Sequence, residues 1–190
     1  MSSSLLLLLA ASCSTSSGGK VGLIGDSITD LSQAPLHQAL DATYEVELVG
    51  KFGARTDEVL PEVKVIAASM PSQAIINIGT NDAIQQVPLA QTRASIDEMV
   101  TAFAAAKCVF LVEINEAITA QGAPRTAEAR AINEQLRDIA DTVPNVRMLE
   151  WNNEIAANGG PTVITFDTVH LSTKGVVVLA DAYRKALADC

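Results

Sequence analysis

Short apolar runs alternate with amphipathic segments from Lys20 to the C-terminus of this 190-residue chain. Alternating strand-like and helix-like segments are typical of a parallel sheet with helices on both faces. No internal repeat and no second composition regime follows Gly19, and a chain of this length can bury the core of one domain. The sequence therefore predicts an α/β fold: a three-layer α/β/α, flavodoxin-like domain over residues 20–190.

The predicted sheet has five parallel strands in the order 2-1-3-4-5. The expected strands are 20–25, 44–49, 74–79, 109–112 and 146–149. The expected helices are 31–41, 56–68, 88–106, 124–141 and 173–188. In this order the switch point lies between strands one and three, and ligands bind at the carboxyl ends of the strands beside it. Residues that follow strands one and three are therefore expected to meet.

The first apolar run ends abruptly in Gly25-Asp26-Ser27. We interpret this stretch as a buried strand that delivers Ser27 into a tight turn at the strand's carboxyl end. A serine hydroxyl held there is exposed and close to backbone N–H groups that can stabilise an oxyanion. Because Gly-Asp-Ser is also ordinary turn chemistry, the interpretation depends on the residues that the fold brings beside it.

Segments after strands two and three and before the last helix are predicted to reach the same edge of the sheet. Together they supply the parts of acyl transfer. Ser27 is the predicted nucleophile, His170 the base that accepts its proton, and Asp167 the group that holds the imidazole tautomer. The predicted oxyanion donors are the backbone N–H groups of Ser27 and Gly53 and the side-chain amide of Asn81.

Four sequence blocks in this order resemble the SGNH, or GDSL-type, hydrolase family. They are Gly25-Asp26-Ser27, Gly53, Gly79-Thr80-Asn81-Asp82 (G-x-N-D) and Asp167-Thr168-Val169-His170 (D-x-x-H). The resemblance implies a flavodoxin-like fold and a hydrolase of carboxylic esters or thioesters that uses neither a metal nor a cofactor. Family substrates include lipid, acyl-CoA, aryl and acetylated-sugar esters. The short chain leaves little room for a lid, so we expect small acyl groups, such as acetyl, on an exposed substrate.

Each block also has an interpretation without catalysis. A serine can cap a helix, a glycine can supply a positive-φ turn, and an Asn-Asp pair can close an Asx turn. His170 is harder to explain in this way, because the chain has only one other histidine, His37. No motif surrounds His37, and we expect it on the surface.

Two other functions would use the same edge of the sheet differently. In the first, Asp26, Asp30, Asp82 and Asp167 form an oxygen-rich Mg²⁺ site in a phosphate-transfer domain. The sequence counts against it, since no P-loop is present and no lysine follows strands one or three. In the second, the protein is a non-catalytic surface lipoprotein whose pocket binds a glycan or an acyl chain. The four ordered blocks favour the hydrolase.

The charge of the chain limits its partners. It has 13 Lys+Arg against 22 Asp+Glu, a formal net charge of -9. Binding of nucleic acid and adsorption to anionic lipid both rest on cationic contacts, so neither is expected. The expected partner is a small-molecule, glycan or lipid ester that serves as the substrate, and we expect the protein to be a monomer.

Residues 1–19 are predicted to be a signal-peptide or lipoprotein-like leader followed by a flexible linker. The apolar run 5–9 is too short to span a bilayer but fits the core of a signal peptide. Residues 9–13 resemble a bacterial lipoprotein box, in which Cys13 becomes a lipid anchor. A plain secretory leader and a disordered hydrophobic tail are the alternatives. We therefore expect an exported protein, either secreted, periplasmic or membrane-anchored, with a cytoplasmic location as the alternative.

The remaining cysteines, Cys108 and Cys190, form no C-x-x-C pair, so a zinc site is not expected. Cys108 begins strand four and Cys190 follows the last helix. In a parallel α/β sheet, strand starts and helix ends share the edge opposite the active site. We predict that the two sulfurs can meet there and form a disulfide outside the cytosol.

Overall fold

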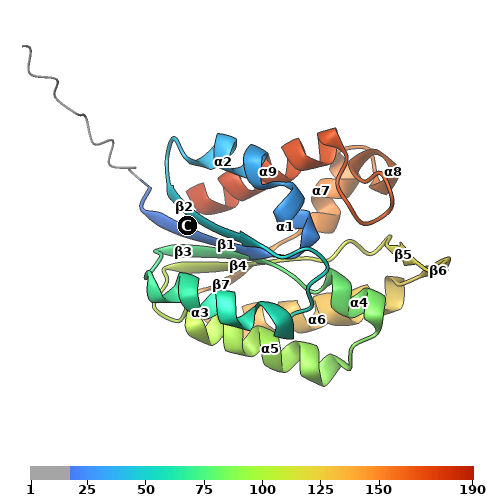
Figure 1. The fold of residues 1–190 in the computed structure, drawn as a ribbon, viewed down its shortest axis with the longest axis horizontal. Coiled ribbons are helices and arrows are strands. Elements are labelled where there is room, and N and C mark those ends of the chain that lie inside the picture. Colours follow the sequence, from blue (N-terminus) through green and yellow to red (C-terminus); the bar gives the residue numbers. More distant parts are fainter. Residues whose placement is uncertain (1–17) are drawn as a thin grey trace, which may run out of the picture.

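The structure is a computed structural model that describes residues 18–190. The proposed signal segment and Cys13 anchor lie outside the described residues. Five parallel strands form one sheet in the order β2-β1-β3-β4-β7, with helices on both faces (Figure 1). This arrangement confirms the predicted fold class and strand order. Within residues 18–190, no helix combines the length and apolar character needed to cross a membrane.

Two sheets are present in the described chain. The main sheet consists of β1 (Lys20–Gly25), β2 (Glu45–Gly50), β3 (Gln73–Asn77), β4 (Cys108–Val112) and β7 (Val146–Leu149). A short antiparallel hairpin consists of β5 (Thr119–Ala120) and β6 (Ala123–Pro124). In the main sheet Gly25 lies beside both Gly50 and Asn77. The ends of β1, β2 and β3 are therefore level, and the loops that follow them start at the same edge.

The helices form two layers, above and below the sheet in Figure 1. One layer holds α1 (Ser27–Leu31), α2 (Gln33–Leu40), α7 (Trp151–Ala157), α8 (Pro161–Ile164) and α9 (Thr173–Ala188). The other holds the 3₁₀ turn η1 (Asp57–Val59), α3 (Leu60–Ala68), α4 (Thr80–Gln85), α5 (Leu89–Ala102) and α6 (Thr126–Thr142). Each layer buries its own hydrophobic cluster against the sheet.

The central strands are apolar on both faces because both faces are covered. Successive side chains of a strand point to opposite sides. Leu23 and Ile75 accordingly join the cluster beneath α2 and α9, whereas Ile24 and Ile76 join the cluster beneath α3, α5 and α6. All four side chains are almost fully buried. Packing on both faces of the sheet holds the carboxyl ends of the strands in place, and the polar loops start from these ends.

Several element boundaries differ from the sequence-based predictions. The helix expected from residue 31 begins at Ser27, because the Asp26 side chain accepts a hydrogen bond from the Ile28 N–H at 2.9 Å and caps the helix there. The segment then breaks at Ser32 into two helices. The helix expected from residue 56 starts as a 3₁₀ turn, and Pro61 occupies the first turn of α3. The helices α4, α7 and α8 and the hairpin were not predicted.

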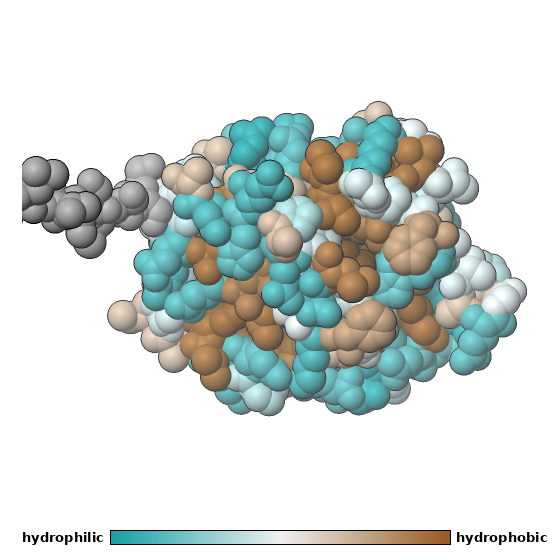
Figure 2. Space-filling model, turned by 45° about the horizontal axis from the view of Figure 1, so that its top comes forward, coloured by the Kyte–Doolittle hydropathy of each residue, from teal (hydrophilic) through white to brown (hydrophobic). Residues whose placement is uncertain are grey.

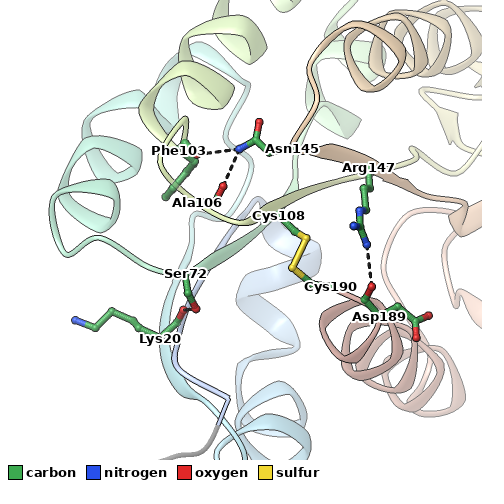
Figure 3. Close-up of a disulfide and its surroundings, with 9 residues drawn as sticks. All are labelled: Lys20, Ser72, Phe103, Ala106, Cys108, Asn145, Arg147, Asp189 and Cys190. Carbon is green, nitrogen blue, oxygen red and sulfur yellow. Dashed lines mark hydrogen bonds between the residues drawn. A yellow bond between two sulfur atoms is a disulfide. The ribbon is translucent and has the colours of Figure 1, made fainter.

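The predicted disulfide between Cys108 and Cys190 is present, with the two Cα atoms 6.1 Å apart (Figure 3). It joins the start of β4 to the end of the chain after α9. Beside it, Arg147 donates a hydrogen bond to the Asp189 carbonyl at 2.8 Å. The disulfide thus closes the amino-terminal edge of the sheet, opposite the loops that follow Gly25.

Candidate active site

The turn after β1 holds Ser27 in a fixed position. Asp26 is fully buried and caps α1, and Ser27 is the first residue of that helix. Ser27 is itself buried, so the expectation of an exposed serine was wrong: the residue is covered because it begins a helix that packs against the strand ends. Gly25 admits no side chain, because a Cβ at this position would overlap the side chain of Thr29. Gly50 at the end of β2 is similarly restricted, because a Cβ there would overlap the backbone of Asp30. Both glycines let α1 pack tightly against the strand ends.

A hydrogen-bonded chain links Ser27 to two residues of the loop before α9. His170 Nε2 lies 3.1 Å from Ser27 Oγ. On the other side of the ring, His170 Nδ1 lies 2.6 Å from Asp167 Oδ2. The structure therefore brings together the three residues that the sequence singled out, although 143 positions separate the serine from the histidine.

The environment of Asp167 determines how the imidazole is oriented. Burial opposes ionisation of this carboxyl, but hydrogen bonds from the His170 ring and from the His170 and Val169 N–H groups outweigh it and lower the pKa of Asp167. An ionised carboxylate can only accept hydrogen bonds. Because Nδ1 must then donate to Asp167, a neutral imidazole presents the lone pair of Nε2 to the Ser27 hydroxyl.

The loop that carries Asp167 and His170 is held in a strained conformation. Thr168 has a φ of 72°, which is rare for a β-branched residue. Asn115 donates to the Thr168 carbonyl at 3.0 Å, and the Thr119 N–H donates to the Thr168 hydroxyl at 3.0 Å. We call these two contacts the Thr168 clasp. No sequence pattern indicated the clasp, because Asn115 lies in an irregular loop after β4 and Thr119 lies in the hairpin, which was not predicted.

Two of the predicted oxyanion donors, Gly53 and Asn81, lie on segments that a hydrogen bond joins. Gly53 has a φ of 74°, as expected for a positive-φ turn. The Asn81 side-chain amide donates to the Ala54 carbonyl at 3.0 Å. An amide nitrogen carries two hydrogens, so this bond orients Asn81 and leaves one hydrogen for another acceptor. The contact also joins the loop after β2 to the start of α4.

Asp82 also connects the loop after β2 to α4, through buried hydrogen bonds. It is buried and accepts hydrogen bonds from the Thr56 N–H at 2.9 Å, from the Thr56 hydroxyl at 2.7 Å and from the Thr92 hydroxyl at 3.1 Å. Gly79 enters α4 with a φ of 115°, a conformation that favours glycine. Within the Gly-x-Asn-Asp block, Asp82 therefore fixes the loop after β2, and Asn81 binds the Ala54 carbonyl of that loop.

Asp26 combines burial with incomplete hydrogen bonding. Its Oδ1 caps α1, while its Oδ2 has no partner among the described residues. Burial raises the pKa of Asp26 to about 7, and the nearby Asp82 adds to this effect, whereas the Ile28 N–H and His170 oppose it. A carboxyl with a strongly raised pKa thus belongs to the residue immediately before the serine. From the sequence, Asp26 was considered as a member of the Gly25-Asp26-Ser27 block and as a metal ligand in the alternative, and its burial was not predicted.

The four aspartates of the Mg²⁺ alternative are engaged in separate structural roles. Asp26 caps a helix, Asp82 binds two threonines and Asp167 binds His170, while Asp30 accepts from Gln33 at 2.8 Å. Over residues 18–190, no three acidic, histidine or cysteine side chains are grouped so that they could hold a metal ion. The geometry therefore gives this alternative no support.

Two phenylalanines beside His170 were not predicted. Phe52 lies at the tip of the loop after β2, and Phe166 immediately precedes Asp167. Both rings stack on the imidazole, with centroid separations of 5.8 Å and 5.9 Å and interplanar angles of 12° and 21°. The other histidine, His37, lies at the surface as expected, where its ring contacts Asp41.

Residues 23–177 match the model of the GDSL-like lipase/acylhydrolase family. This match covers most of the chain and includes Ser27, Gly53, Asn81, Asp167 and His170. The chain belongs to this family. It is accordingly an enzyme of the esterase and acylhydrolase class.

One curated relative and two solved structures illustrate the similarity. A Staphylococcus aureus (strain MSSA476) protein named "Putative O-acetyltransferase" is 29% identical over 169 residues, which are 87% of this chain and 24% of that protein. The chain thus spans about a quarter of the length of the curated relatives it matches.

Among solved structures, the lipase/acylhydrolase of Enterococcus faecalis superposes with a TM-score of 0.77 at 18% identity, over 90% of this chain and 95% of that one. A catalytic mutant of an acetylxylan esterase from Geobacillus stearothermophilus gives 0.71 at 20% identity, over 90% and 94%. At these identities the two likenesses establish the fold.

Proposed function

We propose that this protein is a serine esterase that hydrolyses short-chain carboxylic esters, with Ser27, His170 and Asp167 as its catalytic residues. The observation that carries the proposal is the continuous chain of hydrogen-bonding contacts from Ser27 Oγ through His170 to Asp167, at 3.1 Å and 2.6 Å. These separations are within reach for proton transfer from a serine to a general base and for a carboxylate that orients that base.

In the first half of the reaction, Ser27 Oγ attacks the ester carbonyl carbon while its proton passes to His170 Nε2. The carbonyl oxygen becomes an oxyanion, for which the Ser27 and Gly53 N–H groups and the second hydrogen of the Asn81 amide are the proposed donors. Asp167 stabilises the imidazolium that forms. When the carbon–oxygen bond to the alcohol breaks, Nε2 returns the proton to the departing oxygen, and the acyl group remains on Ser27.

In the second half, His170 removes a proton from water, and the hydroxide attacks the acyl-serine. Collapse of the second tetrahedral intermediate releases the carboxylic acid, and the proton returns to Ser27 Oγ through Nε2. An alcohol in place of water would transfer the acyl group instead. The name of the Staphylococcus relative makes such transfer to an alcohol the natural second candidate.

A small acyl group is proposed because the site is open. The side chains of His170 and Asp167 are 21% and 40% exposed, so solvent reaches both of them. A long acyl chain would need an apolar cover to gain binding energy from burial. The names of the Staphylococcus relative and of the xylan esterase both refer to acetyl groups. Acetyl is therefore the acyl group that we propose.

A chain-length series of p-nitrophenyl esters tests this proposal. The wild type should hydrolyse the acetate with a higher kcat/KM than the octanoate, and Ser27→Ala should lose roughly 10⁴-fold or more in kcat for both. Protein that binds these esters without turnover would instead be the non-catalytic module considered above. A preference for octanoate would contradict the assignment of a short acyl group.

We also propose that the protein is exported and works outside the reducing cytosol. The support is the Cys108–Cys190 disulfide, because such bonds persist mainly in oxidising compartments. Thiol titration of denatured, non-reduced protein prepared from the native host should find neither of these two cysteines free. Two free thiols at these positions would remove this support.

A further inference from the structure

The stacked phenylalanines beside His170 are strongly exposed. Phe52 is 66% exposed and Phe166 is 70% exposed. Figure 2 shows hydrophobic side chains exposed on one face of the molecule, several of them to the right of its centre. Single exposed apolar residues are common and need no explanation. Two phenyl rings that stack on the same imidazole are a different case.

The two rings come from loops that are independently fixed. Phe52 lies in a turn closed by a hydrogen bond from the Ala54 N–H to the Lys51 carbonyl at 3.1 Å. Phe166 donates its own N–H to the His170 carbonyl at 3.0 Å, and the neighbouring residues Thr165 and Leu171 form a β-bridge. The backbone therefore holds both rings beside the imidazole before any substrate arrives.

The chemistry of His170 identifies the part of an ester that these rings would meet. In the proposed mechanism, Nε2 donates its proton to the departing alcohol oxygen, so the alcohol portion must pass next to the imidazole. Phe52 and Phe166 stack on that imidazole. The rings thus border the alcohol portion of the substrate rather than the acyl portion.

We infer that Phe52 and Phe166 form a stacking subsite for a ring in the alcohol portion of the ester, and that this ring is a sugar. The inference rests on the proposed function. The faces of a phenyl ring carry partial negative charge, which attracts the C–H hydrogens on one face of a pyranose. An open-chain alcohol offers no such face.

The setting of the subsite favours a neutral sugar over other ring-bearing alcohols. Because the rings are exposed, the hydroxyl groups of a stacked sugar can stay hydrated while its C–H face is covered. An aryl alcohol would stack as well, but it gains nothing from this hydration. A polyanionic alcohol or thiol is disfavoured by the formal net charge of -9.

The test compares substrates that share the acetyl group and differ in the alcohol. The three substrates are an acetylated methyl pentopyranoside, phenyl acetate and ethyl acetate. The variants are Phe52→Leu and Phe166→Leu, which keep an apolar side chain but lose the aromatic face. Met70→Leu is the matched control, because Met70 is 82% exposed and precedes β3 at the opposite edge of the sheet.

Each phenylalanine variant should lower kcat/KM for the sugar acetate by about 3- to 10-fold, the effect of losing one stacking partner. The value for ethyl acetate should stay within about twofold, and the control should change neither. Equal losses on all three substrates, or no loss, would overturn the subsite. A loss confined to phenyl acetate would overturn the assignment to a sugar.

A fluorophosphonate probe separates failure of the subsite from failure of the proposed function. Both phenylalanine variants should still be labelled at Ser27, because they retain the serine and its base. Wild-type protein that is neither labelled nor active on any of the acetates would overturn the esterase assignment itself.

Discussion

Replacing Asp26 by asparagine should change how the stability of the protein depends on pH. Burial raises the pKa of Asp26 to about 7 in the folded protein, whereas an unfolded aspartate titrates near 3.9. Between these values the folded state holds a proton that the unfolded state has lost. The free energy of unfolding should therefore fall as pH rises from about 4 to about 7, and this contribution should level off at higher pH.

The size of the effect follows from the displacement of the pKa. About three pH units at about 1.36 kcal/mol each give an upper limit of about 4 kcal/mol of stability lost by pH 8. Asparagine keeps the oxygen that caps α1 but carries no charge. Asp26→Asn should therefore match the wild type near pH 4.5 and exceed its stability at pH 8. Asp167 has a lowered pKa, so its contribution is lost only on acidification below about pH 4, outside this window.

The assay is urea-induced unfolding of the full chain at pH 4.5, 6 and 8 at constant ionic strength. Asp138→Asn is a suitable control, because Asp138 lies exposed on α6. We expect the control to follow the wild-type curve and Asp26→Asn to diverge from it as pH rises. Parallel curves for Asp26→Asn and the wild type would refute the argument that the buried carboxyl is neutral in the folded protein.

Three further changes test separate parts of the structure. Asn81→Ala should lower kcat by about 10²- to 10³-fold with little change in KM, because an oxyanion donor acts mainly in the transition state; an unchanged kcat would remove Asn81 from the site. Asn115→Ala should lower kcat about tenfold, because Thr168 loses a contact that holds its strained conformation. Adding Thr168→Gly should restore part of the loss, because glycine adopts a positive φ without strain. Steady-state kinetics that show no restoration would count against the Thr168 clasp. Reduction of Cys108–Cys190, which spans 82 residues, should lower the free energy of unfolding by about 2 to 4 kcal/mol and leave kcat unaltered, whereas a parallel loss of activity would contradict its placement away from the site.

The sequence predicted the architecture because the strands of the main sheet are distinct apolar runs and the long helices carry a periodic apolar stripe. It also pointed to Ser27 and His170, because the segments after β1 and before α9 both reach the carboxyl edge of the sheet and both match ordered blocks of the family. The cysteine pair could be predicted for the same reason: strand starts and helix ends share one edge. These are properties of chain topology, which short patterns can reveal.

Other features depend on local geometry that the sequence does not encode in a readable pattern. The start of α1 at Ser27 depends on the conformation of Asp26, whose burial also displaces its pKa. Phe52 and Phe166 are single apolar residues in loops, without periodic neighbours. Asn115 reaches Thr168 only because an irregular loop folds back on the Asp-x-x-His segment. Contacts between loops of this kind become visible only in three dimensions.

The central claim is that Ser27 is a nucleophile activated by His170, and covalent labelling tests it most directly. Wild-type protein treated with a fluorophosphonate should gain one adduct, which mass spectrometry of the digested protein should map to Ser27. His170→Ala should slow the labelling by about 10³-fold or more and keep the fold, as checked by circular dichroism. An adduct on another residue, or equal labelling rates in the wild type and His170→Ala, would contradict the account.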